Sequence, residues 1–372
     1  MIHNINLRKV LSITSPTLVL NESIIDTNIK LMKEKAEQLN VEFRPHFKTH
    51  QSKYISESFK QQGVTGITVS SVKMAEYFSE HGWMDITIAF PINILEIDNL
   101  NKLPSETKLN VLVVDEEVVT YLDENIKNSI HAFIELDPSY GRSGMSMDSI
   151  PDIQRLKNKI DASSIINFAG FYLHAGHTYK CKGAEEVREV ANTVLDKISK
   201  LKQHFNSPVC YGDTPSCSVL EDFRDVTQIS PGNFVFYDWM QVMIGSCKVE
   251  DIALALYCPV VAKYKERNEI LIHGGAVHLS KEFLLNDAKT PYYGVIAETK
   301  ENGWGNVIEN CFVKSISQEH GLIACSDDFF DSINIGDLVP ILPIHSCLTA
   351  DLMGSYLNLD GVRIDHLSSY PK

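Results

Sequence analysis

The first two thirds of the chain alternate short apolar runs with stretches in which polar and apolar residues are mixed. The runs are rich in β-branched residues, which favours strands, and the mixed stretches have the spacing of amphipathic helices. Residues 22–40 are an example, because apolar side chains recur there at steps of three and four, at Ile25, Ile29, Met32, Ala36 and Leu39. Strands and helices that alternate in this way predict a parallel sheet.

Eight segments of this region predict strands, and helix-like segments lie between most of them. They are VEFRPHFK, GITVSS, DITIAF, NVLVVD, AFIELD, NFAGFYLH, PVCYGD and DVTQIS. Eight parallel strands with helical crossovers predict a closed (β/α)8 barrel.

The last third of the chain changes character. Short apolar segments such as EILIHGGAVHL, CFVKSI, GLIACS and DLVPILPI are joined by turns such as INIGD, with little helical periodicity. This pattern predicts a second, all-β domain. We place the barrel at residues 16–248 and the β domain at residues 249–372, and we expect residues 1–15 to pack on the β domain.

The charge of the chain argues against nucleic acid as a partner. Lys and Arg number 34 and Asp and Glu number 48, and the resulting net charge of −14 repels a phosphate backbone. No apolar run reaches the roughly 18 residues of a membrane helix, and the first residues lack the apolar core of a secretory signal. The 8 cysteines form no CxxC pair, which disfavours a disulfide framework. These features predict a soluble, cytoplasmic protein without nucleic-acid or membrane partners.

Polar side chains collect after five of the predicted strands, at the end of the barrel where such folds place their active sites. The clusters are RPHFKTH, DPSYGRSGM, YLHAGHTYK, YGDTPS and SPGNFVFYD. In the last two, glycines expose backbone N–H groups while Thr214 and Ser216 add hydroxyl donors, a combination that suits a phosphate group. Ordinary turns are the alternative for either motif alone, but both together favour phosphate binding.

Lys48 ends the first predicted barrel strand, among Arg44, His46 and His50. Taken alone, a lysine at a strand end is usually a solvated surface residue. Beside a phosphate site, a lysine buried among apolar and imidazole groups suits a Schiff base, because desolvation and nearby cations lower its pKa. The phosphate-bearing carbonyl cofactor that forms such a bond is pyridoxal 5'-phosphate.

His345 and Cys347 form a His-x-Cys pair in the β domain. On an extended strand, both side chains would point to one face and could bind one ion. An imidazole and a thiolate together favour Zn²⁺ over Mg²⁺ or Mn²⁺. Taken alone, the pair is weak evidence for a metal site, and two buried residues that bind no metal are the better interpretation.

The motifs RPHFKTH, HAGHTY, GDTPS, PGN, QEHG and PIHSC occur in the order found in one enzyme family. The chain resembles, from SPTLVL to ADLMGSY, the D-serine dehydratase and D-threonine aldolase family, the metal-dependent branch of the fold-type III pyridoxal-phosphate enzymes that includes alanine racemase. The resemblance implies that Lys48 binds the cofactor as a Schiff base. It also implies that four residues hold the phosphate: Gly212, Thr214, Gly232 and Asn233.

The same resemblance suggests further neighbours of the cofactor. Arg142 matches the arginine that meets its phenolic oxygen, and Tyr172, His174 and Tyr179 match ring and phosphate neighbours. For Arg142 the alternative is a salt bridge to a carboxylate such as Asp137. For His177, in the same HAGHTY motif, we expect a supporting role with a hydrogen bond to the backbone.

The resemblance also assigns the metal pair. His345 and Cys347 match the zinc ligands of the D-serine dehydratases, whereas the D-threonine aldolases have a carboxylate in place of the thiolate and prefer a harder ion such as Mn²⁺. The family usually has Asn before the histidine and Pro after the cysteine, and this chain has Ile344 and Leu348 there. We expect Zn²⁺, with Mn²⁺ or another divalent ion as the alternative.

The function implied is β-elimination from a D-3-hydroxy amino acid such as D-serine, giving a 2-oxo acid and ammonia. Lys48 would take the Cα proton, and the zinc ion would help the β-hydroxyl group to leave. Retro-aldol cleavage, as in D-threonine aldolase, is the nearest alternative, followed by racemisation. A pyridoxal-phosphate-binding protein without catalysis is the alternative from another class. By analogy with two-domain members of the fold type, we expect a homodimer.

Overall fold

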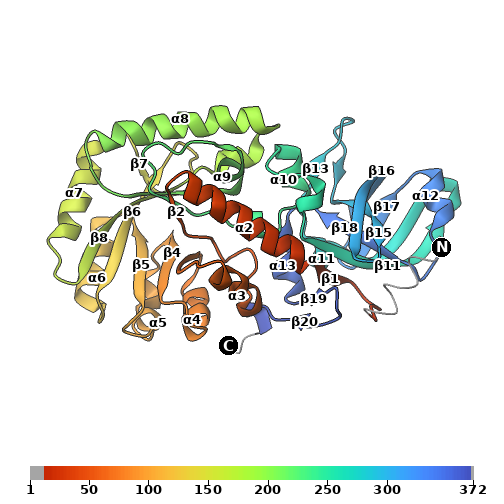
Figure 1. The fold of residues 1–372 in the computed structure, drawn as a ribbon, viewed down its shortest axis with the longest axis horizontal. Helices are drawn as coiled ribbons and strands as arrows, with labels where there is room; N and C mark the ends of the chain where they lie inside the picture. Colours follow the sequence, from red (N-terminus) through yellow and green to blue (C-terminus); the bar gives the residue numbers. More distant parts are fainter. Residues whose placement is uncertain (1–11, 370–372) are drawn as a thin grey trace. The chain divides into compact units, whose positions relative to one another are not determined.

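The computed structural model describes residues 12–369, which form two compact units (Figure 1). The barrel unit contains residues 29–48 and 55–234. The β unit contains, among the described residues, 12–28, 49–54 and 235–369. The chain therefore passes from the barrel unit to the β unit between Lys48 and Thr49.

The barrel unit contains the eight parallel strands that the sequence predicts. In chain order they are β2 (Glu42–Phe43), β3 (Gly66–Val69), β4 (Asp85–Pro91), β5 (Lys108–Val113), β6 (Ile130–Asp137), β8 (Ile166–His174), β9 (Val209–Gly212) and β10 (Gln228–Ile229). Their order in the sheet is β2, β10, β9, β8, β6, β5, β4 and β3, and the short β7 (Met145–Ser146) pairs with β6. The prediction of a (β/α)8 barrel is confirmed.

The barrel closes where the chain continues beyond β2. Thr68 in β3 donates its N–H group to the Pro45 carbonyl group (2.9 Å), and Phe47 donates to the Thr68 carbonyl group (2.8 Å). On the other side, His46 donates to the carbonyl group of Pro231 (2.8 Å). The strand predicted at VEFRPHFK is thus much shorter in the structure. Its backbone nevertheless forms hydrogen bonds to the chain on both sides as far as Phe47.

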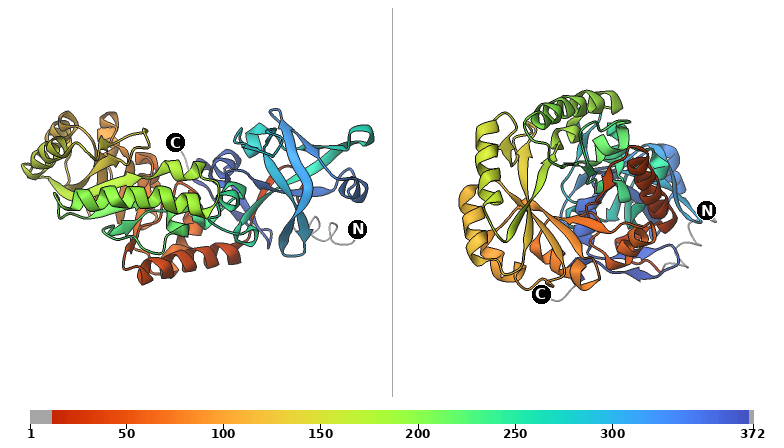
Figure 2. Two further views of the ribbon diagram at one scale, coloured as in Figure 1. Left: turned by 90° about the horizontal axis from the view of Figure 1, so that it is seen from above. Right: turned by 60° about the vertical axis from the view of Figure 1, so that its left-hand side comes forward.

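Helices cover the outside of the barrel strands, as the right-hand view of Figure 2 shows. They are the second part of α2 (Glu22–Gln38), α3 (Lys53–Gln61), α4 (Val72–Glu80), α5 (Ile97–Leu100), α6 (Glu116–Asn125), α7 (Ile150–Asp161), α8 (Ala184–Lys202) and α9 (Thr214–Val219). Each long helix buries one apolar face, and α8 buries Val187, Ala191, Val194, Leu195, Ile198 and Leu201 at helical spacing.

Apolar side chains fill the middle of the barrel. Leu112, Phe133, Tyr172 and Cys210 come from four neighbouring strands and pack together, with Ala89 and Ala169 against them. This packed layer makes the barrel a solid core rather than a channel.

The β unit is built on an antiparallel sheet that closes on itself. The closed ring contains β11 (Leu254–Tyr264), β12 (Glu269–His273), β17 (His320–Ala324), β16 (Gly303–Ile316), β15 (Gly294–Lys300) and β18 (Leu338–Pro343). Beside β11, the sheet continues through β1 (Thr17–Leu20), β19 (Tyr356–Asn358) and β20 (Arg363–Ile364). The prediction of an all-β second part is confirmed.

Short elements complete the β unit. They are α10 (Trp239–Ile244), α11 (Ala276–Leu279), α12 (Asp327–Ser332), α13 (Ser346–Met353) and the hairpin of β13 (Leu284–Leu285) and β14 (Pro291–Tyr292). Strand β1 pairs with β11 from Thr17 to Leu20. The expected packing of residues 1–15 concerns a segment of which residues 1–11 lie outside the described part of the chain. No helix between residues 12 and 369 has the length and apolar character needed to span a membrane.

Candidate functional site

Lys48 lies directly after the point where the barrel closes. Its backbone N–H group donates to Nδ1 of His46 (3.3 Å), and its side chain is exposed between the buried residues Phe47 and Thr49. The expectation that this lysine is buried among apolar and imidazole groups is therefore wrong. The buried flanking residues fix the backbone on both sides, so that the side chain projects from a rigid base.

The other charged residue of this stretch has a structural role. Arg44 is buried, and its guanidinium group binds Asp85 (2.7 Å) and Glu42 (3.2 Å). A third contact is a hydrogen bond to the Thr87 hydroxyl group (3.4 Å). The arginine thus ties the segment before Lys48 to β4.

The residues assigned to the phosphate come together around the start of α9. Thr214 is buried, its N–H group donates to the Tyr179 hydroxyl group (3.3 Å), and its own hydroxyl oxygen accepts the N–H group of Phe234 (3.3 Å). The last bond joins α9 to the loop that contains Gly232 and Asn233, both of them buried. The YGDTPS and SPGN motifs therefore lie side by side, as the sequence predicts.

Gly212 ends β9 next to this loop. A Cβ atom added there would lie 3.3 Å from the Tyr172 hydroxyl oxygen and 3.5 Å from the carbonyl oxygen of Ser230. Tyr172 donates to the Ser230 hydroxyl group (3.5 Å), which in turn donates to Thr68 (2.9 Å). Hydroxyl, amide and backbone N–H groups dominate this region, and such donors fit a phosphate group.

Asp213 holds the loop between β9 and α9 in place. One of its carboxylate oxygens accepts the N–H group of Ser216 (2.6 Å) and the hydroxyl group of Thr178 (3.0 Å). Burial raises the pKa of Asp213 to about 7, which reduces its negative charge beside a candidate anion site. Its φ of 155° favours glycine, so the loop is held in a strained backbone conformation.

His174 ends β8 near the residues assigned to the phosphate. Burial, together with the positive charges of Lys48 and Arg142, lowers the pKa of His174 well below its ordinary value. The imidazole is therefore neutral at physiological pH. Its ring centroid lies 6.2 Å from that of Tyr179.

Arg142 lies in the loop after β6, is exposed, and has its guanidinium carbon 5.9 Å from the centre of the Tyr140 ring. Among the ion pairs of residues 12–369, none joins Arg142 to Asp137, so the alternative of that salt bridge is wrong. Instead, Asp137 accepts the backbone N–H groups of Tyr140 (2.7 Å) and Gly141 (3.1 Å). Asp137 is therefore engaged by the backbone of its own loop and not by the guanidinium group of Arg142.

His177 does not make the backbone hydrogen bond that we expected. It stacks on Tyr140, with ring centroids 6.0 Å apart and planes inclined by 27°. Its Nδ1 atom is buried without a hydrogen-bond partner in the described part of the chain. The residue supports the loop by ring packing.

The metal pair lies in the β unit, at the junction of β18 and α13. His345 is the residue before α13 and Cys347 is in its first turn, so the expectation of an extended strand is wrong. The two groups nevertheless interact. Burial lowers the pKa of His345, but the negative charges of Cys347, Asp238 and Glu282 and a hydrogen bond to Asp238 raise it to about 9. The groups that favour this positive charge would also favour a divalent cation.

Two buried residues, which sequence reasoning missed, support the pair. Asp238 has one carboxylate oxygen 3.2 Å from Nδ1 of His345, and the same oxygen accepts the N–H group (2.9 Å) and the hydroxyl group (3.2 Å) of Ser346. The Sγ atom of Cys347 is hydrogen-bonded to Oγ1 of Thr49 (3.4 Å). Asp238 and Thr49 are 107 and 298 residues away from their partners, so local patterns could not find them.

A second group of possible metal ligands contains His273, His278 and Glu319, whose ligand atoms lie within 4.8 Å of one another. The Nε2 atoms of the two histidines are 3.5 Å and 3.6 Å from the same carboxylate oxygen. However, Gly275 donates its N–H group to Nδ1 of His278 (3.1 Å). A neutral His278 therefore carries its proton on Nε2, which presents a donor to the group rather than a lone pair.

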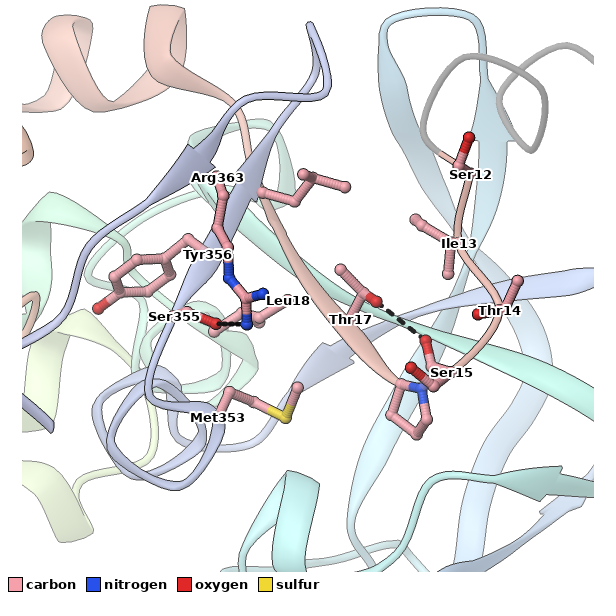
Figure 3. A pocket seen from close by; sticks show the side chains of 12 residues that line it. Ser12, Ile13, Thr14, Ser15, Thr17, Leu18, Met353, Ser355, Tyr356 and Arg363 are labelled. Atoms are coloured by element: carbon pink, nitrogen blue, oxygen red, sulfur yellow. Dashed lines mark hydrogen bonds between the residues drawn. The ribbon is translucent and has the colours of Figure 1, made fainter. Parts of the chain in front are cut away.

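One surface pocket of the β unit lies away from the predicted residues. It has a volume of about 390 Å³ and is lined by residues 12–18, by Arg363 and by a segment from Met353 to Leu357 (Figure 3). Within it, Arg363 donates to the hydroxyl group of Ser355 (3.1 Å). It contains none of the residues assigned to the cofactor or the metal.

Comparison with known proteins covers both units. The model of the alanine racemase N-terminal domain matches residues 20–238, and that of the putative serine dehydratase domain matches residues 253–359. The chain is 31% identical to D-serine dehydratase from Dictyostelium discoideum, over 93% of both chains. It is 25% identical to D-threo-3-hydroxyaspartate dehydratase from Delftia sp. (strain HT23), over 93% of this chain and 94% of the relative. A D-threonine aldolase from Arthrobacter sp is 26% identical over 61% of this chain and 62% of that protein.

Solved structures show the same fold. The Delftia dehydratase has a TM-score of 0.86 at 23% identity, over 96% of this chain and 98% of that one. A cysteine-to-alanine variant of the same enzyme, described as a metal-free form, has a TM-score of 0.85 at 24% identity, over 96% and 98% of the two chains.

Proposed function

Because the chain belongs to the D-serine dehydratase family, we propose that it is a pyridoxal-phosphate- and zinc-dependent lyase that eliminates water from a D-3-hydroxy amino acid. Hydrolysis of the resulting enamine would give a 2-oxo acid and ammonia. The observation that carries this proposal is the pair of His345 and Cys347, surrounded by negative charge in the β unit. A thiolate beside an imidazole suits a Lewis-acidic zinc ion.

The residues of the barrel unit would hold the cofactor. Lys48 would bind its aldehyde carbon. Its phosphate would accept hydrogen bonds from the loops of Gly212, Thr214, Gly232 and Asn233, whose donors cluster as described. When bound, pyridoxal phosphate supplies a sink for the electron pair left at Cα.

Four further residues would surround the cofactor ring. Arg142 would meet its phenolic oxygen, because the guanidinium group is not engaged by Asp137. Tyr172, His174 and Tyr179 would line the ring and the phosphate group, with His174 neutral. The amine of Lys48 would also be the base that takes the Cα proton of the substrate.

His345 and Cys347 would hold the metal ion through Nε2 and Sγ. When bound, Zn²⁺ supplies the Lewis acid that assists departure of the β-hydroxyl group. Two protein ligands leave positions for water and for a substrate oxygen, as in other catalytic zinc sites. Mn²⁺ or another divalent ion is the alternative, and metal content measured on the purified protein distinguishes them.

Retro-aldol cleavage is the second candidate function, and the similarity to the Arthrobacter aldolase favours it. It uses the same cofactor residues but breaks the bond between Cα and Cβ. The thiolate of Cys347 supports elimination instead, because a carboxylate ligand would be expected of an aldolase. Racemisation and cofactor binding without catalysis leave the metal pair without a role.

One experiment separates these reactions. The protein would be incubated with pyridoxal phosphate, Zn²⁺ and D-threonine, with L-threonine as the control substrate, and the products identified by NMR. Formation of 2-oxobutanoate and ammonia is expected. Glycine and acetaldehyde would instead establish the aldolase, and L-threonine formed from D-threonine would establish the racemase. Cofactor binding without any product would show that the protein binds pyridoxal phosphate without catalysis.

We further propose that the protein is a homodimer, by analogy with two-domain enzymes of this fold type. Light scattering coupled to size-exclusion chromatography would give its mass in solution. A mass of one chain, 41.8 kDa, would contradict this proposal.

A further inference from the structure

Asp238 is fully buried directly before α10, and its two carboxylate oxygens serve different elements. Oδ1 accepts the N–H group of Gln241 (2.9 Å) and so caps α10. Oδ2 faces α13, where it lies 3.2 Å from Nδ1 of His345 and accepts two hydrogen bonds from Ser346. One carboxylate therefore joins the start of α10 to the start of α13.

The hydrogen bond to His345 decides which ring nitrogen carries the proton. An ionised carboxylate can only accept hydrogen bonds, so Nδ1 of His345 must be the donor. When this imidazole is neutral, its lone pair is on Nε2, the nitrogen available to a metal ion. The bonds from Ser346 hold Oδ2 in place, so the ring orientation is fixed as well as the tautomer.

Resting on the metal site of the proposed function, we propose that Asp238 is a positioning residue that presets His345 as a metal ligand through Nε2. Such a carboxylate also raises the basicity of the ligand nitrogen. The charges agree with this role, because the negative charges of Asp238 and a Cys347 thiolate together balance the two positive charges of a zinc ion.

His278 in the same unit shows the opposite arrangement. Its Nδ1 accepts a hydrogen bond from the N–H group of Gly275 (3.1 Å), so the proton of the neutral ring is on Nε2. Glu319 meets the Nε2 atoms of His273 and His278 instead of their Nδ1 atoms. The position of one ring proton thus distinguishes His345, whose Nε2 is left with the lone pair, from His278, whose Nε2 carries the proton. We therefore expect one zinc ion per chain.

Asp238→Asn tests this role with little change in shape. Its amide can still cap α10 through the oxygen, but it can present an N–H group to Nδ1 of His345 and so favour the proton on Nε2. We expect the Kd for zinc, measured by competition with a chromophoric chelator, to rise about 10–100-fold. Co²⁺ provides a second readout, because bound Co²⁺ has visible absorption bands. At a Co²⁺ concentration that gives these bands in the wild type, the variant should lack them, and they should return at a higher Co²⁺ concentration.

Two control variants separate this effect from general loss of stability. Asp115→Asn makes the same change at the cap of α6, where Asp115 accepts the N–H groups of Glu117 and Val118. His278→Ala removes a histidine from the second group. Both variants should bind zinc as tightly as the wild type, and thermal unfolding of the metal-free proteins would show that each variant is folded.

The outcomes are distinct. An unchanged zinc Kd in Asp238→Asn would overturn the positioning role. If His345→Ala binds zinc as tightly as the wild type, the proposed metal site itself is wrong. If Asp238→Asn does not fold, ¹⁵N NMR of histidine-labelled, zinc-loaded wild type remains decisive. The histidine signal that disappears in His345→Gln belongs to His345. In the wild-type spectrum this signal should show the proton on Nδ1, and a proton on Nε2 would refute the inference.

Discussion

His50, two residues after Lys48, makes stability depend on pH in a predictable way. It is fully buried, and burial lowers its pKa from 6.5 to about 3. Its Nδ1 accepts the N–H group of Ser52 (3.1 Å). The unfolded chain binds a proton at this histidine below pH 6.5, whereas the folded chain does not until pH approaches 3. Stability must therefore fall as the pH decreases between these two values.

The size of the loss follows from the two pKa values. At pH 5, the protonated unfolded state is favoured by about 2 kcal/mol through this residue alone. His50→Asn removes the titration but keeps an oxygen that can accept the Ser52 N–H group. We expect the free energy of unfolding of the wild type to fall by about 2 kcal/mol more than that of the variant between pH 7 and pH 5.

The assay is urea unfolding of the metal-free protein at both pH values, with a chelator present throughout. His204→Asn, at an exposed histidine, is the matched control and should keep the pH dependence of the wild type. Equal pH dependence in the wild type and His50→Asn would refute the reasoning, because the buried imidazole would then not titrate as its surroundings require.

Three substitutions test the candidate site. Lys48→Ala should abolish the visible absorbance of the lysine-bound cofactor and reduce elimination by at least about 100-fold, the usual contribution of a general base; normal activity in this variant would exclude Lys48. Cys347→Ala should abolish zinc binding and elimination while the cofactor absorbance remains, whereas Cys325→Ala, elsewhere in the β unit, should change neither. Thr214→Val removes a hydroxyl group that accepts the Phe234 N–H bond, and should weaken cofactor binding about 3–10-fold, as measured by absorbance titration; an unchanged Kd would show that this loop does not hold the phosphate.

The barrel could be predicted from sequence because each strand is a short apolar run bounded by turn residues. The predicted length of the first barrel strand differs most from the structure. Pro45 has no N–H group to donate, so toward β3 it only accepts the N–H group of Thr68, and the next bond is donated by Phe47 to the Thr68 carbonyl group. Likewise, the apolar run before His345 suggested a strand that continues through Cys347, but the strand ends at Pro343 and a helix begins at Ser346.

The supporting residues could not be predicted, since they depend on contacts between distant parts of the chain. The Asp before α10 can be recognised from the sequence as a helix cap. Nothing local indicates that its second oxygen reaches His345. The exposed side chain of Lys48 is what a lysine at a strand end usually shows; the expectation of burial came from its assignment to the Schiff base and not from the residue pattern.

The chain order gives Thr49 a particular position between the two sets of functional residues. Lys48 ends a segment of the barrel unit, and Thr49 begins the short segment of the β unit that ends at Tyr54. The hydroxyl group of Thr49 contacts Sγ of Cys347, so one peptide bond joins the lysine assigned to the cofactor and the residue that supports a metal ligand. When Cys347 is a thiolate, this hydroxyl group becomes the donor, and hydrogen bonds to a charged group are the stronger ones. Thr49→Val should therefore weaken zinc binding without removing a ligand, while Thr49→Ser should restore it, because only the hydroxyl group is required for this contact.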